Sequence, residues 1–132
     1  MTSSTRHLTE RIGRPAGAVA AYIRDPANLP DWAAGLASGV RRDGDRWFTD
    51  SPMGPVEVAF VADNDYGVCD HDVTLPDGEV VTNPVRVIAD GDACDVVFTV
   101  RPAAGVTVEA FDADLAAIAA DLATLKRLLE TR

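Results

Sequence analysis

The run Asp70-His71-Asp72 carries the residue types best suited to chemistry in this sequence. Two carboxylates around an imidazole could bind a metal ion or move protons. The run lies in a segment with the alternation of a β-strand, where successive side chains point to opposite faces. His71 shares its face with the apolar Cys69, Val73 and Leu75, so we expect it to point inward and both carboxylates to point to solvent. A regular strand therefore excludes a metal site built from all three side chains.

Three roles stay open for an inward His71. It could line a pocket and form hydrogen bonds only, act as a general acid and base, or ligate a metal. The first role is the most common for a lone histidine on an apolar face, and we expect no metal site. His71 is nevertheless the candidate catalytic residue, because an imidazole is the most reactive group that this strand face offers.

Other signatures of chemistry are absent from the sequence. It contains no glycine-rich phosphate loop, no nucleophile elbow and no specifically spaced carboxylate pair. Its two cysteines, Cys69 and Cys94, are too few for a disulfide scaffold and lack the spacing of a metal site. Asp63-Asn64-Asp65 and Asp90-Gly91-Asp92 lack the spacing and closing glutamate of a calcium loop, so we interpret both as hairpin turns. We expect neither a metal nor a cofactor.

Short elements open the chain. Residues 5–12 alternate like a strand with one wet face. A short helix follows Pro15 and ends before Pro26, since the residue before a proline avoids helical angles. The pattern predicts a second brief helix over 29–35, in which Trp32 either gates a cavity or fills the junction between the short helices and the strands.

The pattern of residues 39–101 predicts an antiparallel meander. Turn signals separate six predicted strands, at 39–43, 45–51, 55–63, 67–75, 79–90 and 93–101. Asn83-Pro84 interrupts the fifth of these, because proline cannot donate to the ladder. Alternation places Val58, Phe60 and Phe98 inward. Trp47 and its neighbour Phe48 both have a claim to the interior, and Arg86 either points outward as a solvated charge, which we favour, or reaches inward as an anchor for a carboxylate.

The chain closes with a predicted helix of about 24 residues. Its apolar side chains recur at steps of four and three, which places them on one stripe: Phe111, Leu115, Ile118, Leu122, Leu125 and Leu129. Thr107 is positioned to cap its first turn. Strands followed by a helix segregated to one side indicate an α+β domain.

Composition restricts the partners. The 132 residues carry 21 acidic and 12 basic side chains, a net charge of −9, and 47% are hydrophobic. Such a charge repels phosphate backbones and anionic lipid surfaces, so we expect no nucleic acid and no membrane as partners. The N-terminal residues lack an apolar signal core, which favours a cytoplasmic location. We expect a monomer or a weak homodimer.

The segment from Asp25 to Trp32, Asp25-Pro26-Ala27-Asn28-Leu29-Pro30-Asp31-Trp32, is similar to a D-P-x-N-L-P-x-W pattern in the START-like or SRPBCC superfamily. The stretch from Asp70 to Gly78 is also similar to short members of it. In its order of elements the whole chain resembles the polyketide cyclase/dehydrase-type group of small bacterial proteins. These motifs concern the fold, and the superfamily hosts carriers, cyclases, hydrolases and co-chaperones.

The resemblance implies a helix-grip fold over residues 1–132. In this fold a curved antiparallel sheet of about seven strands wraps around the long C-terminal helix, and two short helices follow the first strand. A cavity lies between sheet and helix, and we expect it to be lined by Trp32, Trp47, Val58, Phe60, Cys69, His71, Val73, Phe98, Phe111, Leu115, Ile118 and Leu122. In this topology a strand separates Cys69 from Cys94 by about 9–10 Å, so we expect both to be free thiols.

Three classes of function remain. The leading hypothesis is a binding module for a small, largely apolar or aromatic molecule. An apolar pocket wall and a few polar groups would hold this molecule. The second is an aromatase/cyclase-type enzyme of polyketides with His71 as acid and base, which should carry more inward polar groups than this sequence offers. The third is a co-chaperone-like module that binds other proteins.

Overall fold

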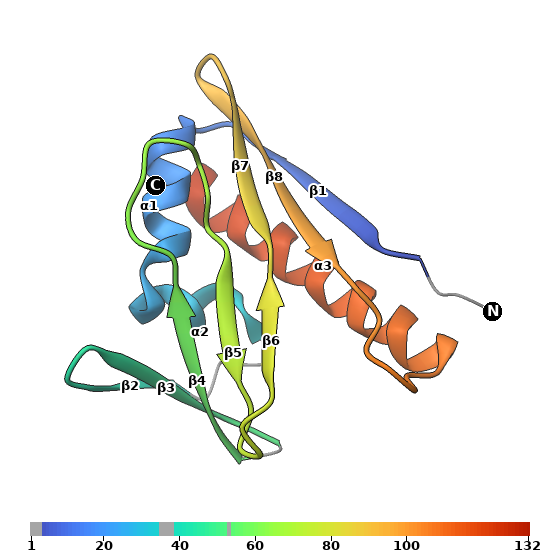
Figure 1. Ribbon diagram of the computed structural model, residues 1–132. Helices are drawn as coiled ribbons and strands as arrows, with labels where there is room; N and C mark the ends of the chain where they lie inside the picture. Colours follow the sequence, from blue (N-terminus) through green and yellow to red (C-terminus); the bar gives the residue numbers. More distant parts are fainter. Residues whose placement is uncertain (1–3, 35–38, 53) are drawn as a thin grey trace.

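The structure, a computed structural model, describes residues 4–34, 39–52 and 54–132. Its strands form two antiparallel sheets that lie against one long C-terminal helix, and two short helices follow the first strand (Figure 1). The elements are β1 (Arg6–Ile12), α1 (Ala16–Arg24), the 3-10 turn η1 (Pro26–Asn28), α2 (Leu29–Trp32), β2 (Val40–Asp43), β3 (Arg46–Ser51), β4 (Gly54–Phe60), β5 (His71–Thr74), β6 (Val80–Asn83), β7 (Val85–Asp90), β8 (Ala93–Val100) and α3 (Val108–Glu130). This α+β arrangement confirms the predicted helix-grip layout.

The sheet is divided where the sequence places a proline. One sheet has the order β2-β3-β4-β5-β6 and the other β1-β8-β7. The predicted strand 79–90 splits at Pro84 into β6 and β7, because Pro84 has no N–H for the ladder. Its carbonyl oxygen still accepts a hydrogen bond from the Thr99 N–H (3.0 Å), which holds the crossing point against β8. The described residues therefore form eight strands where about seven were expected.

A loop joins the two sheets. β4 ends at Phe60 and β5 begins at His71, so the predicted strands 55–63 and 67–75 are both shorter than expected. The loop between them runs along β7: the Val87 N–H donates to the Gly67 carbonyl and the Cys69 N–H donates to the Val85 carbonyl, each at 2.8 Å. These bonds connect the sheets where their ladders part.

The helices begin and end for local reasons. α1 ends at Arg24 because Asp25, in front of Pro26, is extended. α2 ends at Trp32 and is shorter than the predicted 29–35, of which residue 35 lies outside the described residues. α3 starts where expected: the Thr107 hydroxyl oxygen accepts a hydrogen bond from the Ala110 N–H (3.1 Å).

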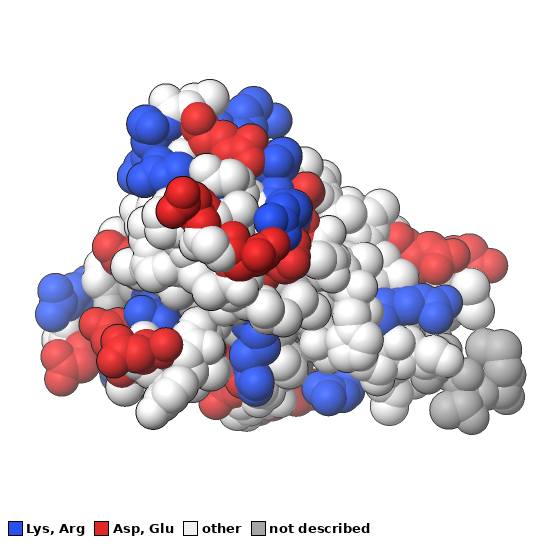
Figure 2. Space-filling view, turned by 90° about the horizontal axis from the view of Figure 1, so that it is seen from above, with Lys and Arg blue, Asp and Glu red and all other residues white. Residues whose placement is uncertain are grey.

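The core is most tightly closed at the C-terminal half of α3. Leu122, Leu125 and Leu129 are buried there, in the helix that contacts β1, whereas Ile118 and Leu115, one and two turns earlier, are only half-buried. The face in Figure 2 carries acidic and basic side chains next to one another, without a continuous basic area. Within the described part of the chain, no helix combines the length and the apolar character needed to cross a membrane.

Candidate functional site

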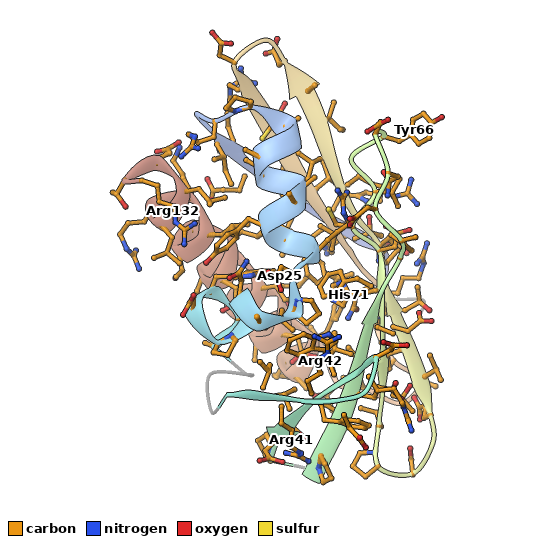
Figure 3. The ribbon with its side chains drawn as sticks, turned by 90° about the vertical axis from the view of Figure 1, so that its left-hand side faces the viewer. Asp25, Arg41, Arg42, Tyr66, His71 and Arg132 are labelled. Carbon is orange, nitrogen blue, oxygen red and sulfur yellow. The ribbon has the colours of Figure 1, made fainter. Side chains whose placement is uncertain are left out.

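His71 lies in the interior, between the short helices and the strands (Figure 3), which confirms the inward orientation predicted from its parity. The residue as a whole is only 9% exposed. Two aromatic rings flank it: the Phe60 ring lies 4.6 Å away between centroids, and the Phe98 ring meets it edge-on at 6.1 Å. The imidazole thus sits in an aromatic setting at the start of β5.

The hydrogen bonds of His71 leave one ring nitrogen underused. Nδ1 lies 3.3 Å from the Cys69 carbonyl oxygen, which can only accept, so this contact places the proton on Nδ1. Nε2 is then an acceptor, and it lies at a long 3.5 Å from the side-chain amide nitrogen of Asn83. Burial lowers the pKa of His71 and outweighs the opposite effects of the Cys69 carbonyl and the nearby carboxylates. The ring is therefore neutral at pH 7.

The carboxylates on either side of His71 point to the other face of the sheet. Asp70 accepts hydrogen bonds from the Val85 N–H (2.9 Å) and from two nitrogens of Arg86 (2.9 and 2.8 Å), and the Arg86 hydrogen bond is the main reason why the pKa of Asp70 is lowered. Asp72 accepts from the Thr82 hydroxyl. Arg86 is exposed and faces outward, as favoured from the sequence. No three acidic, histidine or cysteine side chains in the described ranges are grouped to hold a metal ion.

The strands supply the apolar wall that the alternation predicts. Val58 is buried opposite Val73 on one side and opposite Trp47 on the other, so all three share the inward face. Trp47 lies at the hairpin end of this wall and is half-buried, with the Arg42 guanidinium 5.7 Å from its ring centroid. Trp47, Val58 and Phe60 also line a surface hollow of about 390 Å³ between β3–β4 and the end of α1.

Part of this wall is reachable by solvent. Val81, opposite Val73 on β6, remains 39% exposed although it shares the inward face. On the helix, Phe111 and Leu122 are buried, whereas Leu115 and Ile118 are half-buried. In the middle of α3 the inward stripe is therefore less completely covered than at its C-terminal end.

Trp32 presents a feature that no sequence pattern signalled. The residue is 4% exposed in the hydrophobic core, and its indole Nε1–H has no hydrogen-bond acceptor among residues 4–34, 39–52 and 54–132. Buried polar groups without a partner are rare because each costs about 1–3 kcal/mol. Its burial in the core fits the structural role that we considered beside gating.

The cysteines are buried, free and unreactive in their setting. Both are inaccessible and unlinked, which confirms the prediction. Cys94 lies opposite Ala89 of β7, while Cys69 bonds to Val85 on the other edge of β7, so that strand separates them. Burial raises the pKa of the Cys69 thiol to about 11. Cys69 is therefore a small apolar part of the wall.

Comparisons with known proteins place the fold. No protein family and no curated protein matches the chain in sequence. Among solved structures, an uncharacterised protein from Bacillus thuringiensis is 16% identical with a TM-score of 0.71 and covers 95% of this chain and 98% of its own. A putative protein of the dynemicin biosynthetic locus is 13% identical with a TM-score of 0.71, over 98% of this chain and 48% of its own.

A third similar structure has a named activity. Norcoclaurine synthase from Thalictrum flavum, solved with dopamine and hydroxybenzaldehyde, is 18% identical with a TM-score of 0.61, over 98% of this chain and 88% of its own. At these identities the likeness shows a shared fold alone. This fold is the helix-grip arrangement that the resemblance in sequence implied.

Proposed function

We propose that the protein binds a small, largely apolar or aromatic molecule between the sheets and α3. The observation that carries this proposal is a pair of hydrogen-bonding groups with unused capacity in an apolar interior: Nε2 of His71 as an acceptor and Nε1–H of Trp32 as a donor. A few polar groups within apolar walls are typical of small-molecule sites. The half-buried side chains of Val73, Leu115 and Ile118 are the accessible part of the wall.

The ligand class follows from these groups. An aromatic or apolar body suits the rings of Phe60 and Phe98, which already flank His71. A carbonyl or phenol on that body would match the donor of Trp32 and the acceptor of His71. The norcoclaurine synthase structure, which holds dopamine and hydroxybenzaldehyde in the same fold, supports an aromatic ligand of this size.

That synthase also favours a second candidate function. An enzyme of the polyketide aromatase/cyclase type would use the neutral His71 as a proton relay, with Nε2 taking a proton from the substrate. The two candidates differ in what His71→Ala does. In a binding protein the substitution weakens the ligand, whereas in an enzyme it abolishes turnover and leaves affinity largely intact.

Native mass spectrometry of the freshly purified protein tests occupancy first. A co-purified small molecule supports either candidate, and a consistently empty protein that also fails to bind hydroxybenzaldehyde contradicts both and leaves the protein-interaction class.

Calorimetric titration with the released molecule, or with hydroxybenzaldehyde as probe, then tests the two groups. We expect His71→Ala to weaken binding by about 1–3 kcal/mol, the cost of an unpaired buried partner. Trp32→Phe removes the N–H and keeps an aromatic ring, so it should weaken binding. Unfolding of this variant in urea measures the separate cost of the smaller ring in the core. His7→Ala, which removes an exposed imidazole, is the matched control and should leave affinity unchanged. Equal affinity in all four proteins would contradict the assignment.

A further inference from the structure

The Arg24 side chain is buried without full compensation of its charge. It closes α1, and its side chain is only 9% exposed. Its Nε donates to Asp63 at 3.3 Å and its Nη1 to the Val68 carbonyl at 3.4 Å, both beyond the usual range for such bonds. The guanidinium also makes a hydrogen bond with the Cys69 thiol, whose sulfur is a weak acceptor, so its five N–H donors are still not all used. Since the Asp63 side chain is 95% exposed, water competes for this ion pair.

The nearest other group does not supply the missing negative charge. The Cys69 thiol lies beside the Arg24 guanidinium, but burial keeps its pKa at about 11, and the thiol is neutral at pH 7. A guanidinium has five N–H donors in a planar fork that matches a carboxylate. Arg24 therefore offers buried positive charge and free donors to an anion.

Arg24 lines a hollow whose remaining walls are partly apolar and partly polar. This hollow, of about 470 Å³, lies between α1, the loop before β5, and β7. Its floor includes the buried Ala20 and Val87, and its rim includes Ile88 and Tyr66, which are 54% and 86% exposed. Tyr66 projects from the loop away from the body of the molecule (Figure 3). The two smaller hollows that Arg24 also touches are lined by carboxylates such as Asp25 and Asp63.

The loop that forms one wall is held in place before any ligand arrives. The Asn64 side chain donates to the Ala62 and Val68 carbonyls and accepts from the Tyr66 and Val68 N–H groups. Both N–H donors and the oxygen of the Asn64 side-chain amide are thus used within the loop. Asp65 also lines the hollow, and its negative charge repels a doubly charged ligand more strongly than a singly charged one.

From this geometry we infer a second binding site, separate from the one at His71, in which Arg24 holds the carboxylate of a small aromatic monocarboxylate. The ring of the ligand lies on Ala20, Val87 and Ile88, and the loop that carries Tyr66 borders it. A monocarboxylate matches the single buried guanidinium, and an apolar ring matches the exposed apolar rim.

Nitrogen-15 NMR titration with phenylacetate tests the site in the full chain. We expect chemical-shift changes at the backbone amides of 16–20, 64–67 and 87–89. Phenylacetamide, which has the same shape without the charge, should bind about tenfold more weakly or worse, since charge-assisted bonds are about twice as strong as neutral ones. Inorganic phosphate should bind more weakly than phenylacetate.

Two variants test separately the charge of Arg24 and the volume of the hollow. Arg24→Gln should weaken phenylacetate about tenfold or more, whereas Arg41→Gln, at an exposed arginine paired with Asp50, should leave it unchanged. Gly17→Leu should also weaken binding, because Gly17 lines the hollow and a Cβ there meets no atom within 4 Å. This variant fills the hollow and leaves Arg24 intact, so it decides the question if Arg24→Gln does not fold.

The proposal is wrong if phenylacetate shifts no amides at millimolar concentration, or shifts those around His71 instead. It is equally wrong if phenylacetamide or phosphate binds as tightly, or if both Gly17→Leu and a folded Arg24→Gln bind like the parent protein. The position of the shifts distinguishes failure here from failure of the site at His71.

Discussion

At the scale of single residues, the proposed function rests on the difference between His71 and the carboxylates beside it. Neighbouring positions on one strand place the imidazole among Phe60 and Phe98 and place Asp70 against Arg86 on the outer face. Burial then keeps the imidazole neutral, while ion pairing keeps Asp70 charged. A neutral ring can accept at one nitrogen while it donates at the other, which suits a ligand carrying both donors and acceptors.

The lowered pKa of His71 predicts a pH-dependent stability. Its folded-state pKa lies below the unfolded value near 6.5, so between the two values the unfolded chain binds more protons. The contribution is present above the unfolded pKa and is lost as the pH falls toward the folded pKa. We expect the free energy of unfolding in urea to drop between pH 7.5 and pH 5, by up to about 1.4 kcal/mol per pH unit from this group.

The variant His71→Gln should flatten this pH dependence. His7→Gln, at an exposed histidine, is measured beside it as the matched control. An unchanged slope in His71→Gln would show that the buried ring is not the titrating group.

At the scale of elements, the loop before β5 is the joint between the two sheets. Gly67 makes the joint possible: its φ is +73°, and its carbonyl accepts from the Val87 N–H. A Cβ on Gly67 would lie 2.1 Å from the Val87 carbonyl oxygen. Since that oxygen is backbone, a side chain at this position would push the loop off β7.

We therefore predict that Gly67→Ala destabilises the protein far more than Gly91→Ala. Gly91 also has a positive φ, of +60°, but a Cβ there meets nothing within 4 Å. Gly91→Ala should lower the free energy of unfolding by about 1–2 kcal/mol, the cost of a side chain at a positive φ. Gly67→Ala should lower it by about 3 kcal/mol or more, because the steric clash with the Val87 carbonyl adds to that cost. Urea unfolding of both variants measures the difference, and equal losses would mean that the loop does not need this close approach.

At the scale of the whole molecule, one end of the long helix is fastened and the other is less covered. Near its C-terminus, Lys126 donates to the Arg11 carbonyl (2.8 Å), Glu130 accepts from the Gly13 N–H (2.7 Å), and Arg14 donates to the Leu129 carbonyl (2.8 Å). Toward the N-terminus, Leu115 and Ile118 are half-buried. The stripe of α3 is thus less completely covered at Leu115 and Ile118 than at its C-terminal end.

The two buried thiols report on opening of the molecule. Cys69 and Cys94 lie on opposite edges of β7 and are inaccessible, so a thiol reagent reaches them only when the sheets separate. We expect titration of the native protein to detect little reaction, and titration of the unreduced protein in denaturant to detect two thiols per chain. A bridge mapped by mass spectrometry would contradict this strand order.

Local patterns were sufficient for several features of this protein. Alternation alone indicated the inward His71 and its outward neighbours, because side-chain parity in a strand needs no tertiary information. The stripe from Phe111 to Leu129 indicated the helix that the sheets enclose, and Pro84 indicated where a strand is interrupted. Each of these follows from rules that act over a few residues.

Other features depended on contacts between distant parts of the chain. The missing acceptor at Trp32 Nε1 and the incomplete bonding of Arg24 exist only because particular neighbours surround them, and Arg24 meets Val68 across 44 positions of sequence. The division into two sheets also required the loop at Gly67 to pair with β7. Burial and unmet hydrogen bonds are properties of a packed interior, and a residue's type and its near neighbours do not carry them.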